Sequence, residues 1–198
     1  MFNSSSSSNN KSYLLIFLLS IIAGLSVVFF CELPNNDLWA FSYWSSETFG
    51  FWMFSTSLIV LLSEKRKTAT TNSTIYIFVM FLITTIYKSF RLYLNGYTPF
   101  NSLIDLSLNS MYGWLLYSVP PAIICGILGA ILWSGRKNNI YSKILCILPV
   151  VFIFVESIIL FYSFFINHTK LFSAITDLIW FILYVIFLKK LVFVKRNK

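Results

Sequence analysis

The sequence predicts an all-α fold: a polytopic membrane helix bundle of six transmembrane helices with both termini in the cytoplasm. Three observations lead to this prediction. The chain of 198 residues is 58% hydrophobic and only 11% charged, whereas soluble domains are typically about 25% charged. Its apolar residues form six runs separated by short polar stretches, and about 20 such residues cross a bilayer core of ~30 Å. Its lysines and arginines collect at one set of run ends, which indicates the orientation.

The runs divide the chain into one membrane domain with two polar ends. We expect residues 1–12 to be a disordered polar tail, because a serine-rich segment cannot bury an apolar core. Residues 13–190 then form a single six-helix transmembrane domain, and 191–198 form a basic cytoplasmic tail. The predicted spans are 13–30, 49–62, 74–94, 111–133, 144–166 and 171–188.

The first two spans differ in length and surface. The first carries Ser20 and Gly24 four residues apart, and two small residues at this spacing let another helix approach closely. Internal packing and a contact with a partner helix both fit this pair. The second span is short unless it begins near Glu47.

The third and fourth spans carry polar residues and a predicted helix break. The outer third of span 74–94 has polar residues spaced four, three and four apart, hence on one helical face: Thr84, Lys88, Arg91 and Asn95. Cations facing lipid are costly, so this face should point into the bundle or snorkel to the boundary. Pro120 and Pro121 interrupt span 111–133, remove two of its backbone donors and should kink the helix.

The fifth and sixth spans each carry a carboxylate. Glu156 lies near the middle of span 144–166, with no other charge between Lys143 and Lys170. Asp177 lies near the start of the last span. At about 1.5 Å per residue, Lys88, Glu156 and Asp177 all fall about 20 Å from the inner ends of their helices. These three charges are therefore predicted to share one layer of the bundle.

The basic residues give the orientation. With the N-terminus inside, twelve lysines and arginines lie in cytoplasmic segments and three lie in the outer half. The twelve are Lys11, Lys65, Arg66, Lys67, Arg136, Lys137, Lys143, Lys189, Lys190, Lys195, Arg196 and Lys198; the three are Lys88, Arg91 and Lys170. An asymmetry of this size follows the positive-inside rule. We therefore expect the loops at Asn35 and Asn101 outside in a multi-pass membrane protein. The frequent Ile, Asn, Lys, Phe and Tyr residues resemble the usage of a low-GC bacterium, so we expect a bacterial plasma membrane.

The shared layer predicts a ligand pocket open to the outside. Its candidate ligand-binding residues are Lys88, Arg91, Glu156, Asp177, Pro120 and Pro121. Here the acids would face the cations, and the broken fourth helix would offer free carbonyl groups. The alternative is a buried cluster of ion pairs that fixes helix register and binds nothing.

The sequence favours neither an enzyme nor a nucleic-acid-binding protein. It has no glycine-rich phosphate loop, no HExxH and no GxSxG motif, so we predict no catalytic residues, no cofactor and no metal site. The only histidine, His168, lies in a predicted turn and is expected to be solvated. The three cysteines have no CxxC spacing and are expected to be packing residues: Cys31, Cys125 and Cys146. The net charge of +8 lies in clusters at span ends, where insertion orientation explains it without nucleic acid.

Two resemblances accompany these patterns. The chain resembles an uncharacterised family of bacterial six-helix integral membrane proteins of about this length. That likeness lies in Leu33-Pro34, Trp39, Trp52, Tyr87, Trp114, the Ser134-Gly135-Arg136 turn and Glu156. Its architecture is also similar to the substrate-binding subunits of energy-coupling-factor vitamin transporters. Those subunits contact their partner through Ala-x-x-x-Ala on the first helix, where this chain has Ser20 and Gly24.

Two classes of function remain open. One is a small-solute-binding or transport subunit, whose partners would be the bilayer, a small-molecule ligand and a partner helix or transporter subunit at Ser20 and Gly24. The other is a non-catalytic membrane interaction, immunity or regulatory protein whose buried charges are structural.

Overall fold

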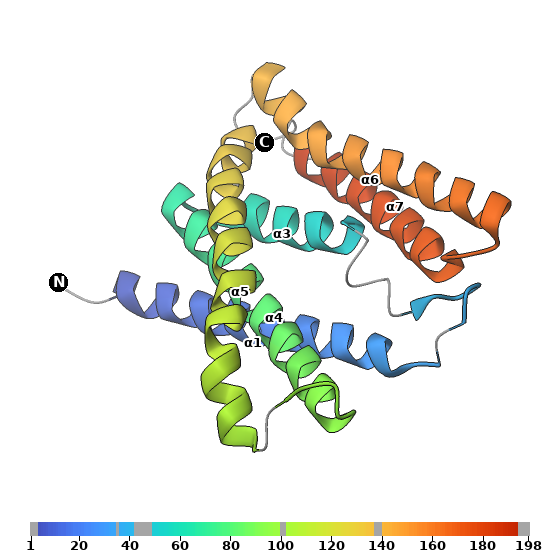
Figure 1. Ribbon diagram of the computed structural model, residues 1–198. Helices are drawn as coiled ribbons and strands as arrows, with labels where there is room; N and C mark the ends of the chain where they lie inside the picture. Colours follow the sequence, from blue (N-terminus) through green and yellow to red (C-terminus); the bar gives the residue numbers. More distant parts are fainter. Residues whose placement is uncertain (1–3, 35, 42–48, 100–101, 137–139, 194–198) are drawn as a thin grey trace. The chain divides into compact units, whose positions relative to one another are not determined.

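A computed structural model describes residues 4–34, 36–41, 49–99, 102–136 and 140–193 of the chain, and in these residues it contains helices and turns but no strand (Figure 1). The elements are α1 (Ser4–Glu32), α3 (Gly50–Leu62), α4 (Arg66–Leu94), α5 (Leu103–Trp133), the 3-10 turn η2 (Ser134–Arg136), α6 (Ile140–Asn167) and α7 (Leu171–Phe193). The predicted all-α class is confirmed for the part of the chain that the structure describes.

Five of these helices are long and apolar enough to cross a membrane. Their membrane-length segments are Tyr13–Glu32, Arg66–Leu94, Leu103–Arg136, Ile140–Asn167 and Leu171–Lys190. The apolar α3 has 13 residues, which at about 1.5 Å per residue is about 20 Å, less than the ~30 Å of a bilayer core. A start near Glu47 lies outside the described residues. A multi-pass helical bundle is therefore supported, with five membrane-length helices and one shorter apolar helix.

The chain forms two compact units, and each combines distant parts of the sequence. Unit 1 consists of Met1–Val28 and Thr70–Leu128, and unit 2 of Phe29–Ala69 and Gly129–Lys198. The single domain over residues 13–190 stays a prediction. The disorder of residues 1–12 also stays a prediction, although α1 begins within them, at Ser4.

Within unit 1, small residues allow α1 to pack closely on α4. Ser20 is fully buried, and its hydroxyl donates to the carbonyl oxygen of Ile16 at 2.6 Å. A Cβ atom at Gly24 would lie 3.0 Å from the Cβ of Ile83. The face carrying Ser20 and Gly24 is thus used for internal packing, which was one of its two predicted roles.

Polar contacts join α4 to α5 in the same unit. The indole Nε1 of Trp114 donates to the hydroxyl of Ser89 at 2.8 Å, and the hydroxyl of Ser73 donates to the carbonyl oxygen of Cys125 at 3.4 Å. A side chain at Gly126 would overlap the hydroxyl of Thr74. Hydrogen bonds between apolar helices satisfy polar groups that lipid cannot.

Pro120 and Pro121 do not end the helix, and the kink predicted there stays a prediction. Helix α5 continues through both prolines to Trp133. Proline fixes φ near a helical value, so it removes a hydrogen bond without forcing the helix to end. The two missing donors leave the carbonyl groups one turn earlier, at Leu116 and Tyr117, without their usual helical partners.

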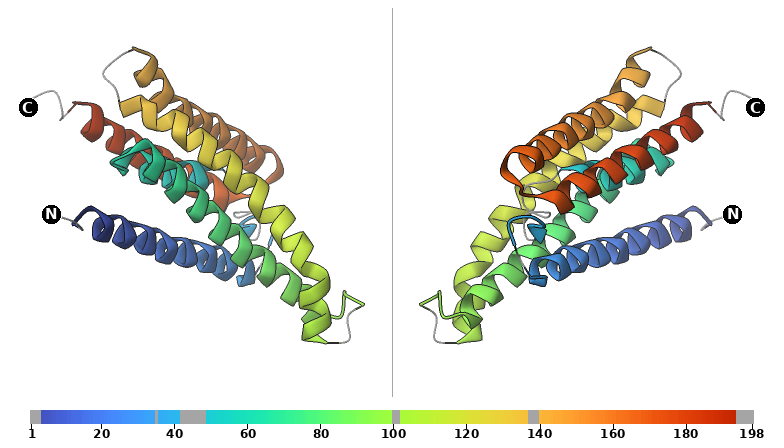
Figure 2. Two further views of the ribbon diagram at one scale, coloured as in Figure 1. Left: turned by 90° about the vertical axis from the view of Figure 1, so that its left-hand side faces the viewer. Right: turned by 90° about the vertical axis from the view of Figure 1, so that its right-hand side faces the viewer.

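Unit 2 is built on three mutually contacting helices, α3, α6 and α7. In both views of Figure 2, α6 and α7 run side by side. Their core contains Leu61 of α3, Cys146 and Ile153 of α6, and Tyr184 of α7. The start of α7 is hydrogen-bonded to the segment that follows α1, because the backbone N–H of Leu171 donates to the carbonyl oxygen of Leu38 at 2.8 Å.

Candidate functional site: a carboxyl pair at the start of α3

The short helix α3 supplies no charged residue to either of its ends. It has no acidic residue in its first turn, no basic residue in its last turn and no side-chain hydrogen bond at its N-cap, Phe49. The first N–H groups and last C=O groups of a helix have no partner within it, and they carry about half a charge at each end. Hydrogen-bond partners for these groups must therefore come from outside α3.

Glu156 of α6 meets the N-terminal end of α3. Its Oε1 accepts a hydrogen bond from the backbone N–H of Phe49 at 2.7 Å. The side chain is half-buried. A charge-assisted bond of this type satisfies a helix donor and places negative charge at the positive end of the helix dipole.

Asp177 of α7 lies at the same end of α3 and is completely buried. A Cβ atom added to Gly50, the first residue of α3, would lie 2.7 Å from Cγ of Asp177. Only glycine, which has no side chain, allows the carboxyl group this close to the helix backbone. The missing side chain at Gly50 therefore leaves room for the Asp177 carboxyl group beside the start of α3.

The two carboxyl groups form a pair with three unsatisfied oxygen atoms. Glu156 lies at the N–H of Phe49 and Asp177 lies at the next residue, Gly50, and Asp177 has no hydrogen bond to Glu156. Oε2 of Glu156 and both Oδ atoms of Asp177 are buried and have no hydrogen-bond partner among the described residues. Buried acceptors without a donor are costly, so the pair is suited to a proton, a cation or a donor group of a ligand.

The opposite end of α3 is met by donors from the α5–α6 connection. The carbonyl oxygen of Ser63, the C-cap residue, accepts from the indole Nε1 of Trp133 at 3.0 Å and from the guanidinium of Arg136. The guanidinium also lies 5.9 Å from the centre of the Trp133 ring. Carboxyl groups at the N-terminus and a cation at the C-terminus both match the helix dipole.

The structure brings together two of the six candidate ligand-binding residues, Glu156 and Asp177. The other four lie in unit 1. Lys88 and Arg91 are exposed on α4, Pro120 is exposed on α5, and Pro121 is half-buried. The pairing of Glu156 with Lys88 or Arg91, and a pocket formed by all six residues, stay predictions.

Sequence reasoning missed the residues that join the acids to α3. Phe49 contributes a backbone N–H, which has no signature in the sequence. Gly50 offered a weak signal, as a glycine at the start of an unusually short apolar run. Arg136 was noted as an orientation charge and as part of the Ser134-Gly135-Arg136 turn, but no contact with the end of α3 was predicted for it.

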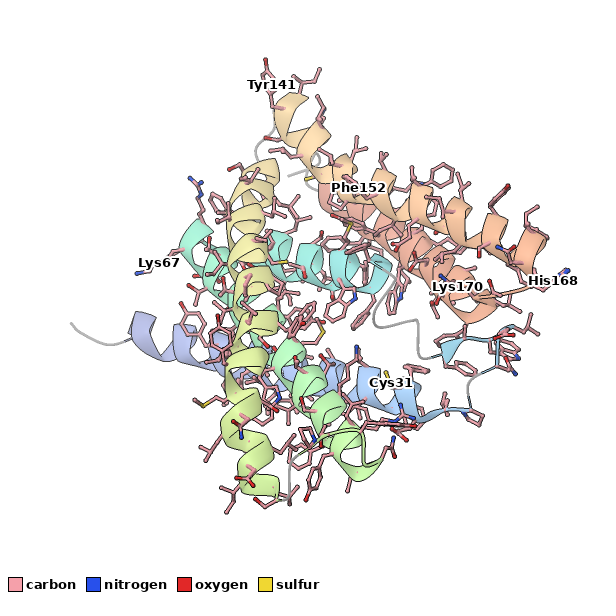
Figure 3. All side chains as sticks on the ribbon, in the orientation of Figure 1. Cys31, Lys67, Tyr141, Phe152, His168 and Lys170 are labelled. Carbon is pink, nitrogen blue, oxygen red and sulfur yellow. The ribbon has the colours of Figure 1, made fainter. Side chains whose placement is uncertain are left out.

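The turn between α6 and α7 carries the chain's only histidine. His168 is exposed, and Figure 3 shows it at the turn between α6 and α7. Within the residues that the structure describes, no three His, Cys, Asp or Glu side chains are grouped in a way that could hold a metal ion.

Comparisons with known proteins identify no relative. No protein-family model, curated protein or solved structure matches this chain significantly.

Proposed function

We propose that this protein is a small-solute-binding or transport subunit whose binding site contains Glu156 and Asp177. One observation carries the proposal: three carboxyl oxygens of the pair are buried without a hydrogen-bond partner among the described residues. Ionisable residues inside membrane bundles commonly mark solute or ion pathways.

The charges at the site favour a solute with a cationic or hydrogen-bond-donating group. The N-terminus of α3 supplies about half a positive charge, and its Phe49 N–H occupies only one oxygen of Glu156. Two ionised carboxyl groups would bring two negative charges to the same place. A protonated amine or a similar donor group would supply both the missing charge and the missing hydrogen bonds.

The proposal includes an orientation with both termini in the cytoplasm and a site open to the outside of a bacterial plasma membrane. The basic residues at the span ends support this orientation. Five crossings would place the termini on opposite sides, so the orientation also requires the segment containing α3 to cross the membrane.

The orientation can be tested by labelling single cysteines with an impermeant thiol reagent on intact cells. The native cysteines are first replaced, and new ones are placed at Asn35, Asn101 and Asn138, which lie outside the described residues. The first two positions should react and Asn138 should not. Labelling at Asn138 alone would overturn the orientation.

A contact with a transporter subunit through Ser20 and Gly24 is the less favoured part of the proposal. Ile83 of α4 occupies this face within unit 1. A partner helix would have to share or replace that contact.

The competing function is a non-catalytic membrane interaction, immunity or regulatory protein. One observation favours it: Glu156 caps α3 and Asp177 packs on Gly50, as structural residues would. Capping alone explains one carboxyl group, however, because a single acceptor satisfies the Phe49 N–H. The second, fully buried carboxyl group supports the solute-binding proposal.

A ligand screen on the purified protein separates the two functions. Thermal stability and native mass are measured with vitamins, amino acids, amines and metal ions for the wild type, Glu156→Gln and Asp177→Asn. Asp105→Asn is the matched control, because Asp105 is exposed at the start of α5. A ligand should stabilise the wild type and Asp105→Asn but neither site variant. Equal stabilisation of all four proteins, or none by any ligand, would count against the solute-binding function.

A further inference from the structure

We propose that Glu156 and Asp177 share one exchangeable proton, so that the pair is a proton-binding site within the helix bundle. This inference deepens the proposed function, because a cationic solute at the same oxygens would displace the proton. It names the species that the pair holds when no solute is bound.

The geometry of the pair requires one positive charge at this place. Asp177 is completely buried, and its carboxyl group lies at Gly50, next to the Phe49 N–H that Glu156 accepts. The half charge of that helix end offsets only part of two negative charges. Two carboxyl groups this close in a water-poor site do not both ionise, as in the carboxyl dyads of proteases.

A second observation on α7 points to the same place. Ser173 lies four residues before Asp177, hence on the same face of the helix, and it is completely buried. Its hydroxyl has no hydrogen-bond partner among the described residues. Because helical side chains lean toward the N-terminus of their helix, the carboxyl group of Asp177 leans toward Ser173. A hydroxyl group both donates and accepts, so Ser173 adds a second buried polar group without a partner to the face of α7 that carries Asp177.

The oxygens at the site suit a proton better than a metal ion. Ca²⁺ takes six to eight oxygen ligands and Mg²⁺ takes six, several of them carboxylates or water. No third acidic, histidine or cysteine side chain joins Glu156 and Asp177 within the described parts of the chain. A proton needs only one carboxyl oxygen.

Few other titratable groups lie near the pair. Helix α3 contributes none between Gly50 and Leu62. Beyond Glu156 and Asp177, the buried titratable side chains that α6 and α7 contribute to the core are Cys146 and Tyr184. The nearest cation preceding Asp177 in the sequence is Lys170, seven residues earlier and about 10 Å away along a helical rise. The protonation of the pair can therefore be measured with little overlap from the protonation of other groups nearby.

The binding step conserves charge and atoms. A proton from water forms an O–H bond with one carboxylate oxygen, and the charge of the pair changes from −2 to −1. Release to water or to a bound base reverses the step. No oxidant, reductant or further reactant is involved.

The test is infrared spectroscopy of the purified wild-type protein without solute, with the carboxyl carbons of aspartate or glutamate labelled with ¹³C. Of the three aspartates, Asp37 and Asp105 are exposed and Asp177 is buried. We expect a C=O band of a protonated carboxyl group at neutral pH that shifts with the aspartate label, the glutamate label or both. The band should persist in Asp105→Asn and disappear in Asp177→Asn.

The isotope shift in the wild type shows whether an aspartate or glutamate is protonated, even if Asp177→Asn does not fold. Absence of a protonated carboxyl band at neutral pH would overturn the proton site. So would a band that neither label shifts. If a solute binds but no such band is seen, the solute-binding function stands and the proton site is excluded. If the band is seen but no solute binds, the proton site stands and the solute-binding function is excluded.

Discussion

Substituting Gly50 by alanine tests the contact between α3 and Asp177 directly. The added Cβ would lie 2.7 Å from Cγ of Asp177, closer than nonbonded carbon atoms approach, so the carboxyl group or the helix must shift. Overpacking of this kind typically costs about 1 to 3 kcal/mol. Alanine in place of glycine in a helix returns about 0.5 to 1 kcal/mol. We therefore expect Gly50→Ala to lower the free energy of unfolding by about 1 kcal/mol, and by at most about 2.5 kcal/mol.

Gly113 of α5 provides the matched control, because a Cβ added there meets no atom within 4 Å. Gly113→Ala should raise the free energy of unfolding by about 0.5 to 1 kcal/mol. Both variants are measured by unfolding in mixed micelles with increasing sodium dodecyl sulfate. In an Asp177→Ala background, Gly50→Ala should lose its cost, since the two changes act on one contact. Equal effects of the two alanines in the wild type would refute the assigned contact.

Three further predictions concern the ends of α3 and the buried charge. Glu156→Gln should keep the hydrogen bond to the Phe49 N–H, whereas Glu156→Leu should lose about 1 to 3 kcal/mol of stability in the same unfolding assay; equal losses would contradict the cap. Trp133→Phe should cost about 0.5 to 1.5 kcal/mol by removing one donor to Ser63, and no measurable loss would show that this bond is dispensable. If Lys88 balances Glu156, Lys88→Leu should partly rescue Glu156→Leu, and additive effects in this double-mutant cycle would exclude the pair.

The broad fold could be predicted from the sequence because bilayer physics leaves few alternatives. Apolar runs of this length must satisfy their own backbone, so they form helices. The second run was predicted at 49–62 and forms α3 at Gly50–Leu62. Its length, about 20 Å along the axis, already set it apart from the other runs. The continuity of α5 could not be predicted, since Pro120 and Pro121 are compatible with both a broken and a continuous helix.

The candidate site was only partly predictable for a related reason. Spacing along each helix gives depth, and depth placed Glu156 and Asp177 in one layer. It gives no information on which helices are neighbours within that layer. The contact of α6 with α7, which brings the two acids together, comes from lateral packing. The bond to Phe49 involves a backbone group, which no pattern of side chains indicates.

The short length of α3 explains why charged residues gather at both of its ends. A helix shorter than the bilayer core can leave at least one end away from water, where unsatisfied N–H or C=O groups are costly. Arg136 and Trp133 meet the C-terminal carbonyl group at Ser63, and Glu156 meets the N-terminal end. One carboxylate and one cation are sufficient for this structural purpose. Asp177 is not needed for this purpose, because a second buried acid adds a desolvation cost that capping the helix does not offset. That excess is the physical reason to expect an exchangeable positive charge beside α3.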